Sequence, residues 1–270
     1  MNQSNPSHVL VQTDGPITKI SLNRPDVLNA MDASLLEALL GAVESATSDR
    51  SCRVIILTGE GRAFCSGGDI CFGLENVNGP GPLASQIGRL RRFMRVSQLL
   101  HESDAITIAA INGACAGAGM SIACACDLRI ASVDAKFNSA FQLAGVPGDF
   151  GITWFLPRLV GPTRARRLLF DPTKHTASEV LNYGLVDEVV PADQVMPAAY
   201  ALAERLLTRA PISLQSVKRD LVESVGLGLS DHLDREAERH ARACQSADAK
   251  EAAAAFFDKR APNFNRADRN

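Results

Sequence analysis

The sequence is poor in aromatic residues and carries almost no net charge. Phe, Trp and Tyr make up 5% of its 270 residues, and the formal net charge is -2 at pH 7. Bulk charge therefore gives no reason to expect a nucleic-acid partner or an anionic membrane surface. Hydrophobic residues make up 46%, which suffices for one large α/β domain or for a core with an accessory segment.

Signatures of secretion and of zinc binding are also lacking. The first ten residues, MNQSNPSHVL, contain neither a basic nor an apolar leader region. The seven cysteines are odd in number, and Cys124 and Cys126 form C-x-C without a second pair at zinc spacing. Cysteines in such apolar surroundings are typical of small core residues in a reducing compartment. We therefore expect a soluble cytoplasmic protein that binds no metal and has no membrane partner.

The longest uncharged run, Ala105 to Cys126, organises the rest of the chain. Ile106 to Ile111 is β-branched and predicts a buried strand, and Asn112-Gly113 ends it. The small residues that follow favour a tightly packed helix, whose first amides have no partner within the helix and can hold a negative oxygen. Three other interpretations remain: a packed helix without chemistry, a dinucleotide loop (although the glycine spacing is not G-x-G-x-x-G), and a transmembrane helix.

Two further stretches contain candidate functional residues. Gly67 and Gly68 are adjacent glycines inside an apolar run, which indicates either that some other group approaches the backbone closely or that the segment is an ordinary loop. Asp149 is the one carboxylate in the glycine-rich segment 145–151, among apolar neighbours. Such surroundings disfavour the charged carboxylate and suit a general base, whereas the alternative is a helix N-cap or turn residue bonded to backbone amides.

The remaining patterns outline the elements. Residues 8–23 predict two strands with a tight turn, and Asp32 is a plausible N-cap for the helix that follows. We expect a mobile segment at 73–86, then a helix to His101 whose arginines form a solvated face or contact a phosphate. From Asp193, a second plausible N-cap, the chain is predicted to be helical, with a compositional shift near residue 200.

Several ordered motifs together resemble the enoyl-CoA hydratase/isomerase (crotonase) superfamily over nearly the whole chain. The matching segments are ISLNRPDVLNAMD, VIILTGEGRAFCSGGDI, IAAINGACAGAGMSIACACDLRIAS, FQLAGVPGDFGITWFLPRLVG, GLVDEVV and FFDKRAPNF. The resemblance implies an α/β fold: a spiral of ββα units in residues 1–200, followed by a helical region at 201–270 used for trimerisation, with trimers commonly pairing into hexamers. It also implies a coenzyme A thioester as substrate and no further cofactor.

The resemblance assigns roles to individual residues. The amides of Gly68 and Ala118 would hold the thioester oxygen, although Ala118 stands where the family usually has glycine. Lys259 would approach the nucleotide phosphates, often those of a neighbouring subunit, unless it is a solvated surface lysine. The other substrate-binding positions that it implies are Val27, Ala30, Ser66, Gly67, Asp69, Ile70, Ser121 and Phe141.

Departures from the family pattern bear on the reaction. Hydratases of this family use two glutamates, whose positions correspond here to Ser121 and Phe141, and neither side chain can act as acid or base. Asp149 matches the acidic position of the isomerases, although Pro147 lies one residue earlier than in their pattern. An acyl-CoA isomerase that moves a double bond or rearranges a ring epoxide is the leading hypothesis. The alternatives are an atypical or weak enoyl-CoA hydratase and a catalytically weak CoA-thioester-binding protein.

Overall fold

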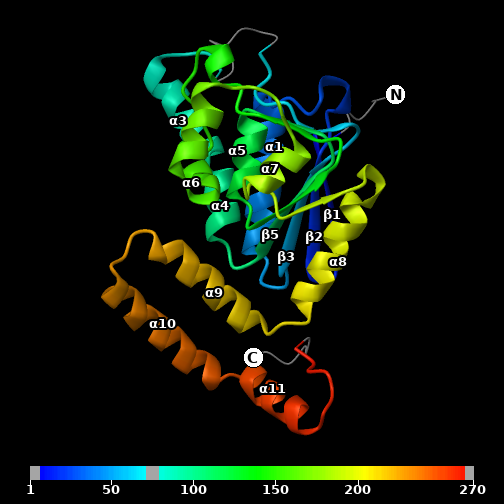
Figure 1. Ribbon diagram of the computed structural model, residues 1–270, viewed down its shortest axis with the longest axis vertical. Helices are drawn as coiled ribbons and strands as arrows, with labels where there is room; N and C mark the ends of the chain where they lie inside the picture. Colours follow the sequence, from blue (N-terminus) through cyan, green and yellow to red (C-terminus); the bar gives the residue numbers. More distant parts are fainter. Residues whose placement is uncertain (1–6, 71–78, 265–270) are drawn as a thin grey trace.

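The computed structural model describes residues 7–70 and 79–264 (Figure 1). A six-stranded sheet in the order β1-β2-β3-β5-β7-β10 forms its centre. The first two strands pair antiparallel, as predicted, and the other pairings are parallel. The strands are β1 Val9–Asp14, β2 Ile17–Leu22, β3 Val54–Gly59, β5 Ile106–Ile111, β7 Leu128–Ser132 and β10 Glu188–Val190.

A second sheet of four short strands lies in the order β4-β6-β8-β9. Its strands are β4 Ala63–Cys65, β6 Ala114–Ala116, β8 Lys136–Asn138 and β9 His175–Thr176. After β3, β5 and β7, which belong to the large sheet, the next strand in each case joins the small sheet. The helices α5, Ala118–Ala125, and α6, Ile152–Phe170, follow the second and third such pairs. This repetition is the predicted series of ββα units.

Helices cover both faces of the large sheet. On one face, Val195, Ala199 and Ala203 of α8 pack against apolar side chains of the central strands. The other face packs on α1 and the buried helices in one large core. The remaining elements of the main body are η1 Pro25–Val27, α1 Ala33–Ser48, α3 Leu83–Phe93, α4 Arg95–Glu102, η2 Gln142–Ala144, α7 Ala177–Asn182, η3 Ala192–Gln194 and α8 Val195–Leu207.

Three C-terminal helices stand apart from this body at one end of the molecule (Figure 1). They are α9 Pro211–Ser224, α10 Leu229–Cys244 and α11 Ala247–Phe257. Lys218 of α9 ties them to the core, because its buried ammonium donates to the carbonyls of Leu100 and Ala105 and to the Asp127 carboxylate. Apolar side chains such as Leu229 and Phe256 are largely exposed in the single chain. The expected trimerisation through this region stays a prediction.

Of the two predicted helix N-caps, one is confirmed and one is wrong. Asp32 caps α1 as expected, since its carboxylate accepts from the Leu35 amide. Asp193 does not cap α8, because it lies within the short turn η3 and its carboxylate accepts from the Gln194 side chain. The boundary predicted at residue 200 falls inside α8, which packs on the sheet as a whole, so the core extends to about Leu207.

The segment between β4 and β5 is only partly described. The helix expected to run from Leu83 to His101 is two helices, α3 and α4, joined at Met94. Their arginines face solvent, and Arg92 and Arg95 pair with glutamates of α1. Of the segment that we expected to be mobile, at 73–86, residues 73–78 lie outside the described residues, whereas residues 83–86 belong to the start of α3. None of the described helices combines the length and apolar character that a bilayer crossing requires.

Candidate active site

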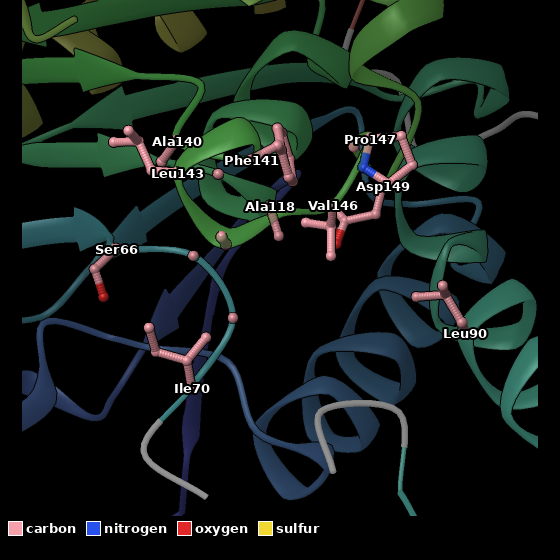
Figure 2. Close-up of a pocket in the computed structure, with 15 residues that line it drawn as sticks. Ser66, Ile70, Leu90, Ala118, Ala140, Phe141, Leu143, Val146, Pro147 and Asp149 are labelled. Atoms are coloured by element: carbon pink, nitrogen blue, oxygen red, sulfur yellow. The ribbon is translucent and has the colours of Figure 1, made fainter. Parts of the chain in front are cut away.

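A cavity of about 460 Å³ opens between the two glycine-rich turns and the loop that precedes α6 (Figure 2). Gly67 and Gly68 line it from the first turn, Ala118 from the start of α5, and Asp149 from the loop. In Figure 2, Ala118 is seen between the turn that carries Ile70 and the loop that carries Asp149. Further apolar lining comes from Leu90, Ala140, Phe141, Leu143, Ala144 and Val146.

The first turn is held by a short bridge to Met31. The Met31 amide donates to the Gly67 carbonyl (2.8 Å), and the Asp69 amide donates to the Met31 carbonyl (2.9 Å). In such a parallel bridge the neighbours of Gly68 make the hydrogen bonds, so the amide of Gly68 itself points away from Met31. Because Gly68 also lines the cavity, its amide is available to a ligand there.

The second turn places Ala118 at the beginning of a buried helix. Gly117 precedes it with φ 49° and ψ -128°, a conformation that favours glycine. The first amides of a helix have no acceptor one turn earlier, so the amide of Ala118 is left unpaired. The helix lies close against β4: a Cβ added to Gly119 would stand 2.6 Å from the Cβ of Cys65. The predicted tight packing of small residues is therefore present.

The two turns touch each other. A Cβ on Gly67 would lie 3.3 Å from the Ala116 carbonyl oxygen and 3.5 Å from the Gly117 Cα. Across residues 7–70 and 79–264, no hydrogen bond engages the amide of either Gly68 or Ala118. Two unpaired amides, from adjoining turns on the wall of one cavity, form a donor pair suited to an oxygen that gains negative charge.

Asp149 faces the same cavity with a poorly solvated carboxylate. Its Oδ1 is buried and has no hydrogen-bond partner, and desolvation raises the pKa of the carboxyl to about 6. The N-cap alternative is wrong, because Gly151 occupies that position and α6 has no side-chain cap. A carboxylate with this pKa is poised to take and return protons near neutral pH, as its apolar sequence context predicts.

Backbone strain and aromatic packing shape the loop around Asp149. Phe150 has φ 45°, a conformation uncommon for a bulky residue, and the flanking Gly148 and Gly151 also have positive φ. A Cβ added to Gly148 would meet Ile152 at 2.8 Å and the ring of Phe141 at 3.8 Å. The Phe141 ring therefore packs on the backbone that carries the carboxylate, and it also lines the cavity.

The other predicted substrate-binding residues near the cavity do not all face it. Ser121 is fully buried, its hydroxyl donates to the Gly117 carbonyl (3.2 Å), and it is not part of the cavity wall. The Asp69 carboxylate is paired with Arg24 (3.0 Å) instead of facing the cavity. Ser66 and Ile70 do line it. Ser121 does not reach the cavity because its side chain bonds back to the preceding turn of its own helix.

Three predicted positions lie outside the cavity wall. Val27 is partly exposed in the short turn η1, and Ala30 is buried next to the bridge. Lys259 is exposed and follows α11, a helix that Figure 1 shows at the opposite end of the molecule from α5 and α6. Within one chain it does not reach the cavity, so its predicted role requires a neighbouring subunit.

Sequence reasoning missed the apolar lining from other elements. Leu90 of α3 belongs to a helix that sequence patterns place only as a solvated basic face. Leu143 and Val146 are exposed apolar residues beside the glycine-rich loop, and this exposure is visible only in the folded chain. The pairing of Arg24 with Asp32 and Asp69 near the first turn was missed as well.

Fold and site define a class of protein: an α/β protein in which two unpaired backbone amides and one poorly solvated carboxylate share the wall of a cavity. A family model described as enoyl-CoA hydratase/isomerase matches residues 12–267. The chain therefore belongs to the enoyl-CoA hydratase/isomerase family, as its motifs predict.

Named relatives span nearly the whole chain. A crotonyl-CoA hydratase of Syntrophomonas wolfei is 30% identical, covering 95% of this chain and 97% of the relative. A 1,2-epoxyphenylacetyl-CoA isomerase of Escherichia coli is 32% identical with the same coverage. The crystal structure of a putative enoyl-CoA hydratase from Streptomyces coelicolor superposes with a TM-score of 0.90 at 30% identity, covering 97% of each chain. Relatives of similar identity thus include both hydratases and an isomerase.

Proposed function

We propose that this chain is an acyl-CoA isomerase that moves a double bond, or rearranges a ring epoxide, through a thioester enolate. For a 3-enoyl thioester, the Asp149 carboxylate takes a proton from C2, and the electron pair of that C–H bond forms the enolate. The amides of Gly68 and Ala118 hold the enolate oxygen. The Asp149 carboxylic acid then returns the proton to C4, leaving the double bond between C2 and C3.

One observation carries this proposal: among the described residues, one carboxylate lies on the cavity wall together with two unpaired amides. Asp149 has a pKa near 6 and no internal partner for Oδ1. A base that must release and recapture a proton works best with a pKa close to the operating pH. One carboxylate suffices for a proton shuttle, whereas delivering water across a double bond calls for further polar groups.

The base and the oxyanion donors each have a typical effect on the reaction rate. A positioned general base contributes about 100- to 10,000-fold, and losing one oxyanion donor typically costs roughly 2.7–4 kcal/mol. The Ala118 methyl lies on the cavity wall and narrows the space beside the amide, while leaving the donor intact.

The remaining binding roles follow the family resemblance and are part of the proposal. By the resemblance, Val27, Ala30, Ser66, Asp69 and Ile70 would contact the adenine and pantetheine parts of coenzyme A. Lys259 would reach the nucleotide phosphates from a neighbouring subunit of a homotrimer or hexamer. Coenzyme A enters as part of the substrate, so no separate cofactor is required.

Replacement of the base tests the proposal. Asp149→Asn keeps the size of the side chain and removes the proton acceptor. With trans-3-hexenoyl-CoA or a ring 1,2-epoxide CoA thioester, we expect turnover to fall by about 100- to 10,000-fold. The matched control is Asp193→Asn, at an exposed aspartate of η3 outside the cavity wall, which should retain wild-type turnover. Unchanged turnover in Asp149→Asn removes this residue from the mechanism.

An atypical hydratase is the second candidate, because several relatives are named as hydratases. In that case Asp149 would position water instead of shuttling a proton. The apolar ring of Phe141 on the wall and the internally bonded Ser121 weigh against it, since neither can share the acid–base work. Tight acyl-CoA binding without turnover of any thioester would instead indicate a binding protein.

A further inference from the structure

The half-buried guanidinium of Arg24 lies next to the first glycine-rich turn and outside the cavity wall. Arg24 Nη1 donates to the Ala30 carbonyl (2.6 Å) and to Asp69 Oδ2 (3.0 Å), and Nη2 pairs with Asp32 Oδ2 (3.2 Å). The side chain of Arg24 is 18% exposed and that of Asp69 is 6% exposed. One planar cation therefore joins three points of the chain, of which Ala30 and Asp69 are buried and Asp32 is 32% exposed.

These three points frame the segment that supports Gly68. Ala30 precedes Met31, whose amide and carbonyl bond the residues on either side of Gly68. Asp69 directly follows Gly68, and Asp32 begins α1. The guanidinium thus fastens the supporting segment and the residue next to the donor amide to each other.

The supporting segment needs such fastening, because its own backbone is strained. Leu28 has φ 55° and Asn29 has φ 56°, both in the left-handed region. The Asn29 side chain accepts from the Arg24 amide (2.8 Å) and donates to the Ala63 carbonyl (2.8 Å). Consecutive non-glycine residues in this region persist only where surrounding contacts hold them, and Arg24 supplies contacts from both its backbone and its side chain.

We propose that Arg24 is a positioning residue for the Gly68 amide: its guanidinium, bonded to Ala30 and Asp69, sets the direction of that donor toward the thioester oxygen. The inference rests on the proposed function in one respect, namely that an acyl thioester occupies the cavity. Arg24 itself does not line the cavity, so it acts through the backbone of the first turn.

A test that does not require turnover measures the carbonyl stretch of bound hexanoyl-CoA carrying ¹³C at the thioester carbon. Hydrogen bonds from the two amides polarise the carbonyl and lower its frequency in the wild type. In Arg24→Gln we expect a smaller lowering at saturating ligand, with Arg24→Lys intermediate, because an ammonium keeps the charge but cannot bond both partners in the same plane. Asp69→Asn should reproduce the Arg24→Gln spectrum.

Kinetics provide the second readout. With trans-3-hexenoyl-CoA, Arg24→Gln should lower kcat by about 10- to 100-fold, less than the roughly 100- to 1,000-fold typical of removing an oxyanion donor. KM should change less than about threefold, and the pH midpoint set by Asp149 should stay in place. The effects of Arg24→Gln and Asp69→Asn should be strongly non-additive. Arg92→Gln, which breaks a surface pair with Glu37, is the matched control.

The outcomes separate this inference from the proposed function. If the wild type shifts the carbonyl without isomerising any thioester, the proposed function fails and the role of Arg24 stands. A wild-type carbonyl frequency in folded Arg24→Gln, Arg24→Lys and Asp69→Asn overturns it. A raised KM at unchanged kcat also overturns it, because Arg24 would then act in ligand binding. Should Arg24→Gln fail to fold, the lysine and asparagine variants decide.

Discussion

The two walls of the cavity are built on different principles. The donor wall consists of main-chain amides, Gly68 and Ala118, fixed by a backbone bridge and by a helix start. The opposite wall depends on one side chain, Asp149, on a loop with left-handed residues around it. A backbone donor survives every substitution except proline, which also constrains the backbone, so it is otherwise disturbed only through packing, whereas the base can be removed directly. The comparison therefore predicts different mutational signatures for the two walls.

The largest expected effect comes from disturbing the packing beneath the donor wall. In Gly119→Ala, the new Cβ would stand 2.7 Å from the Cys65 carbonyl oxygen, so α5 and β4 must separate. Overpacking of this kind costs about 1–3 kcal/mol of unfolding free energy, and the Ala118 donor shifts with the helix. Chemical denaturation and turnover should both report the change.

The matched control is Gly41→Ala, within α1, where a Cβ meets nothing within 4 Å. It should leave turnover unchanged and raise stability by about 0.5–1 kcal/mol, since alanine favours a helix over glycine. Equal stability and activity in the two variants would contradict the packed donor wall.

On the base wall, removal of the charge should increase stability. Burial raises the pKa of Asp149 to about 6, above its ordinary value, so the folded protein binds its proton more tightly than the unfolded chain. The tighter proton binding adds fully to the free energy of unfolding below about pH 4, and this stabilisation is lost as the pH rises through about 6. Asp149→Asn should therefore unfold with a free energy up to about 3 kcal/mol higher than wild type at pH 7.5, because the shift from 3.8 to about 6 counts at roughly 1.4 kcal/mol per pKa unit.

The gain should disappear near pH 4, where the wild-type carboxyl is protonated. Denaturation curves at the two pH values measure it. A variant that is less stable than wild type at both would mean that the carboxylate is held by favourable contacts, contrary to its unpartnered Oδ1.

A smaller effect should follow from opening the base wall to water. Phe141→Ala removes the ring that packs on Gly148, next to the carboxylate. Better solvation should lower the pKa of Asp149 and move the pH midpoint of kcat/KM downward from about 6 by about 1 unit. Leu143→Ala, at a cavity residue that is 73% exposed, should leave the midpoint in place. A midpoint that stays near 6 in Phe141→Ala would show that other groups desolvate the base.

Local chemistry made much of this fold predictable from sequence. The β-branched run at Ile106–Ile111 is a central strand, and Asp32 caps α1. The raised pKa of Asp149 follows from its apolar neighbours in sequence, which are also its neighbours in space. Glycine pairs indicated close approach, and Gly67 and Gly117 do approach each other.

Long-range pairing could not be predicted from the same signals. The carboxylate of Asp69 meets Arg24 from 45 residues earlier, and no periodicity connects the two. Ser121 bonds back to its own turn, a choice that depends on its rotamer. Aspartate is a typical N-cap residue, but at Asp193 the Pro191 carbonyl accepts from the Gln194 amide and closes a short turn. The helix α8 therefore begins after that turn.

The central claim is that Asp149 moves a proton along the acyl chain while two backbone amides hold the enolate oxygen, and that no water is added. Turnover in water labelled with both deuterium and oxygen-18, followed by mass spectrometry of the acyl chain, tests it most directly. The account predicts no oxygen-18 in the product, and solvent deuterium only to the extent that the Asp149 carboxylic acid exchanges its proton with solvent before returning it. Oxygen-18 bound to an acyl-chain carbon would contradict it and assign the chain to the hydratases.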